Sequence, residues 1–294
     1  MINKCINPKT VEEALDILES NGKDVKLIAG GTDLVIDLRN NKIDKNILMN
    51  ISKLKELRFI TIDENEITIG SGTKFIEIIE NQHIKEKIVG LWKACKSVGS
   101  PQIRNMGTIG GNICNGSMAA DSVPPLLALD ATALIIGKNK TRSVPLRELY
   151  LDKGKVDIAD DEILYAIKFH RLREKESISF EKLGLRKALA IARISCSIYI
   201  NLENNSIKDI KIATGALGKY PQRENHIEKR LVNKKVDEII LKDIAEEMSK
   251  HVSKRLKGRS SRSFKSIAIK GIFAEAYKSA IKGANDESHK SHNK

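Results

Sequence analysis

The sequence has few cysteines, few aromatic side chains and no long apolar run. Its 294 residues include only four cysteines, Cys5, Cys95, Cys114 and Cys196, and no two stand at the two- to four-residue spacing of zinc or iron–sulfur ligands. We therefore expect reduced, mostly buried thiols and no metal cluster on this chain. No stretch reaches the roughly 18 uncharged apolar residues of a transmembrane helix, and the start lacks the apolar run of a secretory signal. The pattern predicts a cytoplasmic protein with no membrane partner.

The net charge of +13 raises the question of a nucleic-acid partner. We interpret the lysines and arginines as spread along the chain among acidic residues. Only 4% of the residues are aromatic, which leaves few platforms on which bases could stack. The charge therefore indicates a general lysine bias, and we expect no nucleic-acid partner.

Apolar spacing predicts a small β-α-β unit at the start of the chain. Thr10 and Glu13 form a capping box for a helix that ends at Asn21-Gly22. A strand over 25–29, a helix from Thr32 to Leu38 and a strand over 47–51 follow.

The remainder alternates hairpins with helices before it changes character. Residues 58–62 and 66–70 read as a hairpin, followed by helices marked by Ile76 and Ile79 and by Ile88 to Cys95. The later predicted strands are 131–136, 141–144, 162–169, 178–183, 195–202 and 207–213, and the later predicted helices are 222–231, 236–252 and 263–282. The charged stretch 170–177 is a predicted boundary, and the order after it, strands then helices, favours a separate α+β domain.

Two glycine-containing segments concentrate the chemistry. In AGGTDL (29–34), Gly30 and Gly31 stand between a predicted strand and a helix, where bare amides and the helix dipole can receive an anion. The second, 107–122, presents small donors and one carboxylate, as a ligand with phosphates, ribitol hydroxyls and a heteroaromatic edge requires. Neither segment is the G-x-G-x-x-G fingerprint or a P-loop, and each alone is also typical of a glycine turn.

Taken together, three segments resemble one protein family. KLIAGGTDLV (26–35), SPQIRNMGTIGGNICNGSMAADSVPPLLALDA (100–131) and FEKLGLRKALAIARIS (180–195) are similar to the flavoprotein subunits of molybdenum hydroxylases, which include xanthine dehydrogenase and carbon monoxide dehydrogenase. The resemblance covers roughly residues 1–280. It implies an α+β chain: a two-subdomain FAD-binding fold of the vanillyl-alcohol-oxidase type, then a small domain with a three-stranded antiparallel sheet plus helices. The implied boundaries are 1–55 and 56–175 for the subdomains, 176–282 for the C-terminal domain and 283–294 for a disordered tail.

The resemblance also assigns cofactor-binding residues, while it implies no catalytic residue and no metal ligand on this chain. The implied FAD contacts are Leu27, Ile28, Ala29, Gly30, Gly31, Thr32, Asp33 and Leu34 around the pyrophosphate and adenosine, Thr108, Ile109, Gly110, Gly111 and Asn112 in a second phosphate-side loop, and Asn115, Asp121, Leu164 and Lys182. The residues themselves leave alternatives open. Asp121 could cap the helix that follows it, Lys182 could face solvent, and the basic residue nearest the flavin could be Arg186 or Lys187.

By resemblance, this chain carries electrons and does not hydroxylate the substrate. Electrons would pass from a large molybdenum-cofactor subunit through the [2Fe-2S] clusters of a small subunit to FAD, and then to NAD+ or another acceptor. Xanthine is the favoured substrate of the complex, with nicotinate and related heterocycles open, and a dimer of heterotrimers is the expected assembly. Two rival hypotheses are a stand-alone FAD-dependent oxidoreductase with its own organic substrate and a basic surface-binding module.

Overall fold

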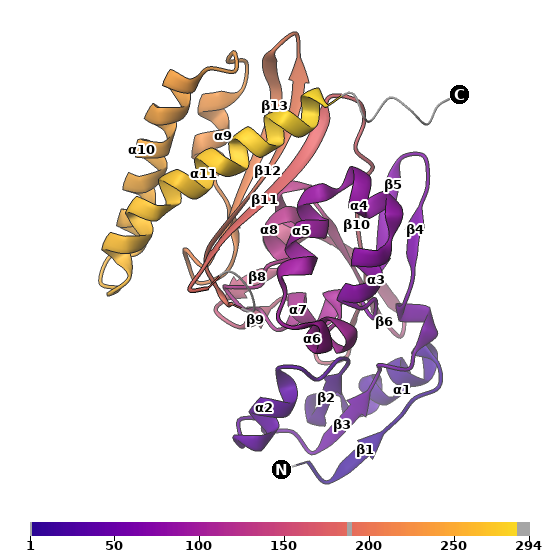
Figure 1. Cartoon of the computed structure of the whole chain (residues 1–294). Coiled ribbons are helices and arrows are strands. Elements are labelled where there is room, and N and C mark those ends of the chain that lie inside the picture. The colour runs from indigo at the N-terminus through magenta and orange to yellow at the C-terminus, as the bar shows by residue number, and fades with distance from the viewer. Residues whose placement is uncertain (1, 187–189, 287–294) are drawn as a thin grey trace. The chain divides into compact units, whose positions relative to one another are not determined.

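The chain folds into two compact units that draw on separate stretches of sequence. The structure is a computed structural model that describes residues 2–186 and 190–286 (Figure 1). The first unit comprises Met1–Ile78, Gly99–Gly116 and Ala131–Arg171, and the second comprises Ile79–Val98, Ser117–Asp130 and Leu172–Lys294. The expected domain boundary between residues 175 and 176 stays a prediction. The two compact units are not consecutive in sequence, because the second also takes two stretches from before that point.

A three-stranded parallel sheet opens the first unit. Its order is β1-β3-β2, with β1 at Lys4–Ile6, β2 at Val25–Ile28 and β3 at Ile47–Asn50. The predicted β-α-β unit is confirmed, since α2 (Leu34–Arg39) joins the parallel strands β2 and β3. Strand β1 has only three residues, too few for an apolar period to show in the sequence.

Helix α1 (Val11–Asn21) packs its apolar face into the core of this region. Val11, Ala14, Leu15 and Leu18 are all buried there. Thr10 caps the helix as predicted, because its hydroxyl accepts the Glu13 amide at 3.1 Å. The second arm of the capping box differs: the Glu13 carboxylate accepts the amide of Lys9, at 2.7 Å.

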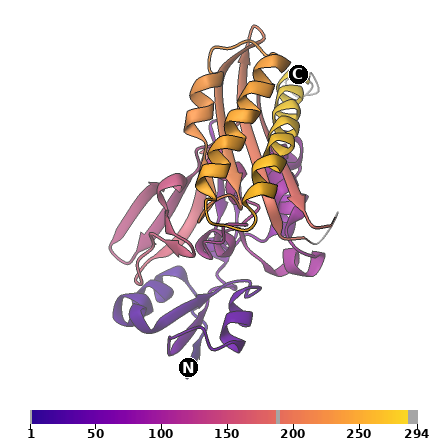
Figure 2. The ribbon, with the colours of Figure 1, turned by 90° about the vertical axis from the view of Figure 1, so that its left-hand side faces the viewer.

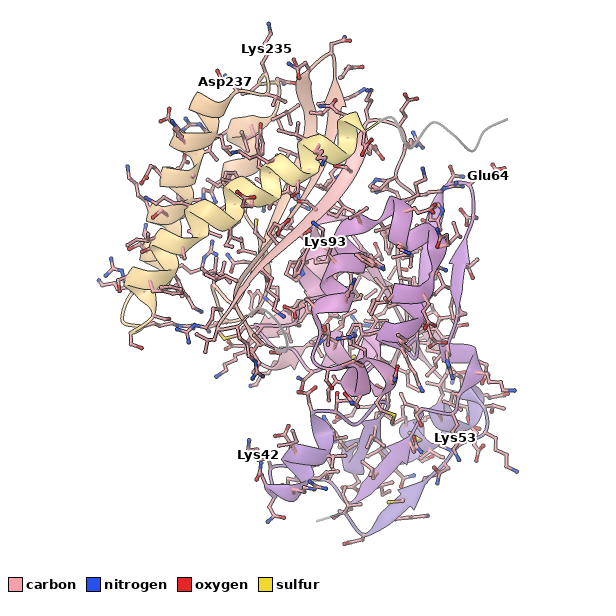
Figure 3. The ribbon with its side chains drawn as sticks, viewed as in Figure 1. Lys42, Lys53, Glu64, Lys93, Lys235 and Asp237 are labelled. Carbon is pink, nitrogen blue, oxygen red and sulfur yellow. The ribbon has the colours of Figure 1, made fainter. Side chains whose placement is uncertain are left out.

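A five-stranded antiparallel sheet forms the rest of the first unit's framework. Its order is β4-β5-β10-β6-β7. The strands are β4 (Ile60–Ile62), β5 (Glu66–Gly70), β6 (Thr132–Gly137), β7 (Lys140–Pro145) and β10 (Ile163–His170), with a separate pair β8 (Tyr150–Asp152) and β9 (Lys155–Val156). Both predicted hairpins are confirmed, and Glu64 lies at the tip of the first one (Figure 3). The helical segments are α3 (Phe75–Glu80), α6 (Pro101–Met106) and α7 (Ile109–Cys114), with 3₁₀ turns at Gly22–Asp24, Lys55–Leu57 and Leu146–Glu148.

The second unit is built on an antiparallel sheet of order β11-β12-β13-β14. Its strands are β11 (Glu176–Gly184), β12 (Ala192–Glu203), β13 (Ser206–Gly215) and β14 (Gln222–Arg223), and its helices are α4 (Gln82–Lys87), α5 (Val89–Ser97), α8 (Val123–Ala128), α9 (Asn225–Leu231), α10 (Glu238–Arg255) and α11 (Arg262–Asn285). The predicted three-stranded sheet is correct apart from the two-residue β14. Helix α11 runs to Asn285, so the tail predicted to be disordered from residue 283 is helical at its start, and residues 287–294 lie outside the described residues.

Alternate side chains of β12 point to opposite faces of this sheet, and different helices cover the two faces. The even-numbered side chains from Ile194 to Leu202 enter the core that α9, α10 and α11 close, and Figures 1 and 2 show these helices over one face. The odd-numbered Ser195 lies on the other face, toward Pro124 of α8. Helix α5 packs along the edge strand β11, where Lys93 (Figure 3) pairs with Glu181 at 3.3 Å.

A buried carboxylate ties the sheet to α10. Glu224 is fully buried and accepts two hydrogen bonds from the Arg255 guanidinium, at 2.8 and 2.7 Å. The Thr214 hydroxyl donates to the same carboxylate at 2.6 Å. A carboxylate removed from water to this degree is tolerated only because these donors replace its hydration.

We predict that Arg255→Leu lowers the free energy of unfolding by about 3–5 kcal/mol, because it leaves the Glu224 carboxylate buried without a counter-charge. The double variant Glu224→Leu/Arg255→Leu should recover much of this loss, since both charges are then absent. Urea unfolding of the three proteins measures the effect. Equal losses in the single and double variants would contradict the assignment of the cost to an unpaired charge.

Candidate functional site

The two glycine segments identified in the sequence meet within the first unit. A Cβ atom built on Gly30 would lie 2.1 Å from the carbonyl oxygen of Met106 and 2.8 Å from the Cα of Gly107. Real side chains do not tolerate such distances, so only glycine allows the backbone at residue 30 to lie against the backbone at 106–107. The contact joins the end of β2 to the start of α7, which are far apart in the sequence.

The first segment presents a run of unused backbone donors. Among the described residues, none of the five amides from Gly30 to Leu34 has a hydrogen-bond acceptor, and the first bonded amide after them is that of Val35, which donates to the Gly31 oxygen at 3.0 Å. Gly31 has a φ of +69°, which turns the chain between β2 and α2. Consecutive free amides at a helix start form a concave cradle that suits an anion such as a pyrophosphate.

The second segment is a short helix, not the loop of donors expected from its sequence. Thr108 caps α7 and accepts the amide of Gly111 at 3.0 Å. The amides of Ile109 and Gly110 donate to the carbonyls of Thr73 and Ser71, at 3.0 and 2.9 Å. The small donors expected in this segment therefore do not include the amides of 109–111, because a good N-cap and the neighbouring chain already use them.

The paired glycines of α7 have different roles. A Cβ on Gly110 would lie 2.5 and 2.6 Å from the Cβ and carbonyl oxygen of Ser71, so this glycine serves close packing. A Cβ on Gly111 would meet a single atom within 4 Å, the Thr108 hydroxyl oxygen at 3.0 Å. Gly111 is exposed, so its bare backbone faces open space in which a ligand can approach.

Other expected contacts share the first unit. Leu164 lies in β10, against which α7 packs, and is only 4% exposed. Asn112 lies on α7 and is half-buried. Asn115 follows the last residue of α7 and is exposed. Leu27, Ile28 and Ala29 are half-buried at the end of β2 and beyond. The structure thus places 27–34, 108–112, Asn115 and Leu164 in one unit.

Asp121 and Lys182 belong to the second unit, where they pair with each other. The Lys182 ammonium lies 2.5 Å from Oδ2 of Asp121, and their side chains are 12% and 7% exposed. The same ammonium donates to the Ser97 carbonyl at 3.1 Å, and the Ser97 hydroxyl donates to Oδ2 at 3.3 Å. Solvent exposure, the alternative for Lys182, is therefore wrong.

The Asp121 carboxylate retains one unused oxygen. Its Oδ1 is buried and has no hydrogen-bond partner among the described residues. No amide of α8 donates to the carboxylate, so the capping alternative is wrong. Burial raises the pKa of Asp121 to about 6, although the Lys182 charge and the hydrogen bonds from Lys182 and Ser97 oppose the rise. An orphaned buried acceptor is costly unless a donor reaches it.

The two other basic residues considered for a position near the flavin are Arg186 and Lys187. Arg186 is exposed, and Lys187 lies outside the described residues.

Sequence reasoning missed the residues that hold the expected ones in place. Met106, Ser71 and Ser97 carry no motif, and each acts through a contact with a residue distant in sequence. In the described part of the chain, no three His, Cys, Asp or Glu side chains gather as metal ligands, and no helix is both long and apolar enough to cross a membrane.

Comparison with known proteins identifies the family. Residues 1–170 match the model of the FAD binding domain in molybdopterin dehydrogenase, and residues 179–280 match the CO dehydrogenase flavoprotein C-terminal domain. The xanthine dehydrogenase FAD-binding subunit of Escherichia coli O157:H7 is 33% identical over 277 residues, covering 94% of each chain. The chain belongs to this FAD-binding family. The nicotinate dehydrogenase FAD-subunit of Eubacterium barkeri is 32% identical over 276 residues, 92% of this chain and 93% of that one.

A solved structure agrees on the fold. A chain of the carbon monoxide dehydrogenase of Hydrogenophaga pseudoflava superposes with a TM-score of 0.90 at 24% identity, covering 96% of this chain and 98% of that one. The family match, and not this likeness of fold, shows that FAD is the cofactor of the chain. The residues present fit such a group, since the free amides after Ala29 suit a pyrophosphate.

We predict opposite outcomes for two glycine substitutions in the FAD-binding chain. Gly111→Ala should leave the free energy of unfolding within about 1 kcal/mol of the parent, because alanine suits a helix, yet weaken FAD binding at least about tenfold by filling the open side. Gly30→Ala should destabilise the FAD-free chain itself, by about 1–3 kcal/mol or more, because it overlaps the Met106 carbonyl. Calorimetric FAD titration and urea unfolding separate the effects, and full FAD affinity in Gly111→Ala would refute the role given to that face.

The Asp121 carboxyl should make stability depend on pH. Its pKa in the folded state, about 6, lies above the unfolded value, so its stabilising contribution is complete below about pH 4 and is lost as the pH rises through 6. We predict that the parent loses up to about 3 kcal/mol between pH 4 and 7 relative to Asp121→Asn, which does not titrate. Urea unfolding at several pH values measures this difference, and a constant offset across that range would count against a raised pKa.

Proposed function

We propose that this chain is the FAD-bearing electron-transfer subunit of a xanthine dehydrogenase-like molybdenum hydroxylase. The observation that carries the proposal is the run of free amides at 30–34, in a chain whose full-length relatives are named FAD subunits. These relatives match over nearly their whole length, so the proposal rests on both domains. The proposed partners are a molybdenum-cofactor subunit and a [2Fe-2S] subunit.

The cofactor would be held mainly by backbone. The amides from Gly30 to Leu34 would bind its pyrophosphate, with the start of α2 adding partial positive charge. Gly111 would allow close approach on the side of α7, where Asn112 and Asn115 would add side-chain amides. Leu164 would supply an apolar contact on the same unit.

Within this proposal, FAD supplies the redox chemistry when bound, accepting electrons and passing them on. The chain's residues fix orientation and local charge. Lys182, held at 2.5 Å by Asp121 and at 3.1 Å by the Ser97 carbonyl, keeps its position without free rotation. The unused Oδ1 of Asp121 offers an acceptor for a donor on the ligand. No general base on this chain is required, because the proposed hydroxylation takes place on the molybdenum subunit.

The proposed substrate of the complex is a nitrogen heterocycle, with xanthine ahead of nicotinate. Relatives named for both compounds match at nearly equal identity. The acceptor is proposed to be NAD+. Hydride transfer to NAD+ and electron transfer to another acceptor place different demands on a flavin site. The identity of the acceptor can therefore be tested separately from the identity of the cofactor.

We predict that the purified chain is yellow, with absorption bands at roughly 370 and 450 nm from the isoalloxazine ring and one FAD per chain. It should contain no stoichiometric iron. Xanthine should bleach these bands only when the two proposed partner subunits are present, and added NAD+ should then restore them. Bleaching of the isolated chain by a small organic substrate would instead support a stand-alone oxidoreductase.

A further inference from the structure

The basic residues of the second unit are not evenly spread, contrary to the expectation from overall composition. Residues 248–274 contain no aspartate or glutamate but eight lysines and arginines. This stretch covers the end of α10, the turn at Gly258 and the first half of α11, which join at one end of the helical layer (Figure 1). Like charges crowded on adjoining helices repel unless something neutralises them.

A cleft of about 510 Å³ opens where these two helices meet. It is lined by four cations and three hydroxyls, namely Lys250, Lys254, Lys257, Arg262, Ser249, Ser253 and Ser266. The cations are exposed, whereas the serines are buried or half-buried. No carboxylate lines the cleft.

The cations of the cleft lack counter-charges in the described part of the chain. Lys250, Lys254 and Lys257 make no ion pair or side-chain hydrogen bond there. Other lysines of the same unit are paired, for example Lys270 with Glu246 at 2.7 Å. An unpaired lysine is not unusual on this surface, and the cleft differs because three of them line one hollow together with Arg262.

The cleft is partly organised by hydrogen bonds between the helices. The Nε of Arg262 donates to the Ser253 hydroxyl at 3.0 Å, which orients the guanidinium and leaves its two terminal nitrogens without a partner among the described residues. The Ser249 hydroxyl donates to the Ser266 carbonyl at 2.5 Å. A guanidinium fixed in this way can present two parallel donors to a phosphate.

The start of α11 has the opposite charge from the one its dipole favours. Its first turn contains no acidic residue, and its N-cap, Ser261, makes no side-chain capping bond. Just inside it, Lys265 is 8% exposed, and burial, together with Arg193 and Arg259, lowers its pKa. Lys265 donates to the Ala216 carbonyl at 2.6 Å and does not line the cleft, so an anion there would be bound by Arg262 and the three lysines.

We infer that the α10–α11 cleft binds a ligand that carries two or more linked phosphate groups. Four cations match the charge of a di- or triphosphate, and the Ser253 hydroxyl, which accepts from Arg262 and has its own proton unused among the described residues, supplies a neutral donor to its oxygens. Every lining residue belongs to the second unit, and none is among the proposed FAD contacts. The inference goes beyond the proposed function and does not depend on it.

Inorganic triphosphate is the probe, titrated calorimetrically into the full-length, FAD-loaded chain at about 0.15 M salt. We expect saturable binding of one triphosphate per chain. The variant Lys254→Gln/Arg262→Gln should weaken this binding at least about tenfold. Lys234→Gln/Lys235→Gln removes the same charge at exposed positions outside the cleft (Lys235 in Figure 3) and should change it by less than about twofold. Flavin absorbance should be unchanged in both variants.

Any one of four results would overturn the inference. Non-saturable binding, or equal weakening in both variants, would show that triphosphate is held by general electrostatic attraction and not by a specific site in the cleft. Sulfate that binds as tightly as triphosphate would remove the requirement for linked phosphates. A single-stranded oligonucleotide that binds more tightly through the same two residues, and that triphosphate does not displace, would assign the surface to nucleic acid.

Discussion

The close contact of two backbones at Gly30 is the constraint on which the candidate flavin site depends. With no side chain at residue 30, the end of β2 lies directly against residues 106 and 107 and so adjoins the start of α7. The two segments then divide the work. The first leaves its amides free for a ligand, whereas the second spends its own amides on the neighbouring chain and offers only the bare surface of Gly111. Backbone donors need no rotamer ordering, so such a site is largely preformed.

The second unit holds a buried pair of opposite charges. Lys182 and Asp121 reach each other from β11 and from the turn before α8, and Ser97 at the end of α5 bonds to both. The carboxylate is more buried than a single ion pair can fully offset, which explains its raised pKa. Structural stability alone would not favour an orphaned oxygen there. A polar group kept at such a cost is typical of a binding site.

Much of the fold could be predicted from the sequence, because periodic elements such as α1 and β6 record their environment in their own residues. Three-residue β1 and two-residue β14 could not, since each exists only through pairing with a distant strand. At the site, the glycine positions were evident, but their roles were not. Gly110 and Gly111 are adjacent and chemically identical, and only the position of Ser71 distinguishes packing from openness. The acid-free stretch at 248–274 is visible in the sequence, but the cleft that its side chains line is visible only in the structure.

The contact between Gly30 and Met106 joins positions 76 residues apart, and this separation has a consequence for folding. Closing so long a loop costs chain entropy before any ligand contact is made, so the cradle belongs to the late, non-local part of the folding reaction. A dinucleotide that binds only the closed form shifts that equilibrium by mass action. Supply of the vitamin-derived cofactor would then govern how much of the newly made chain reaches its native state.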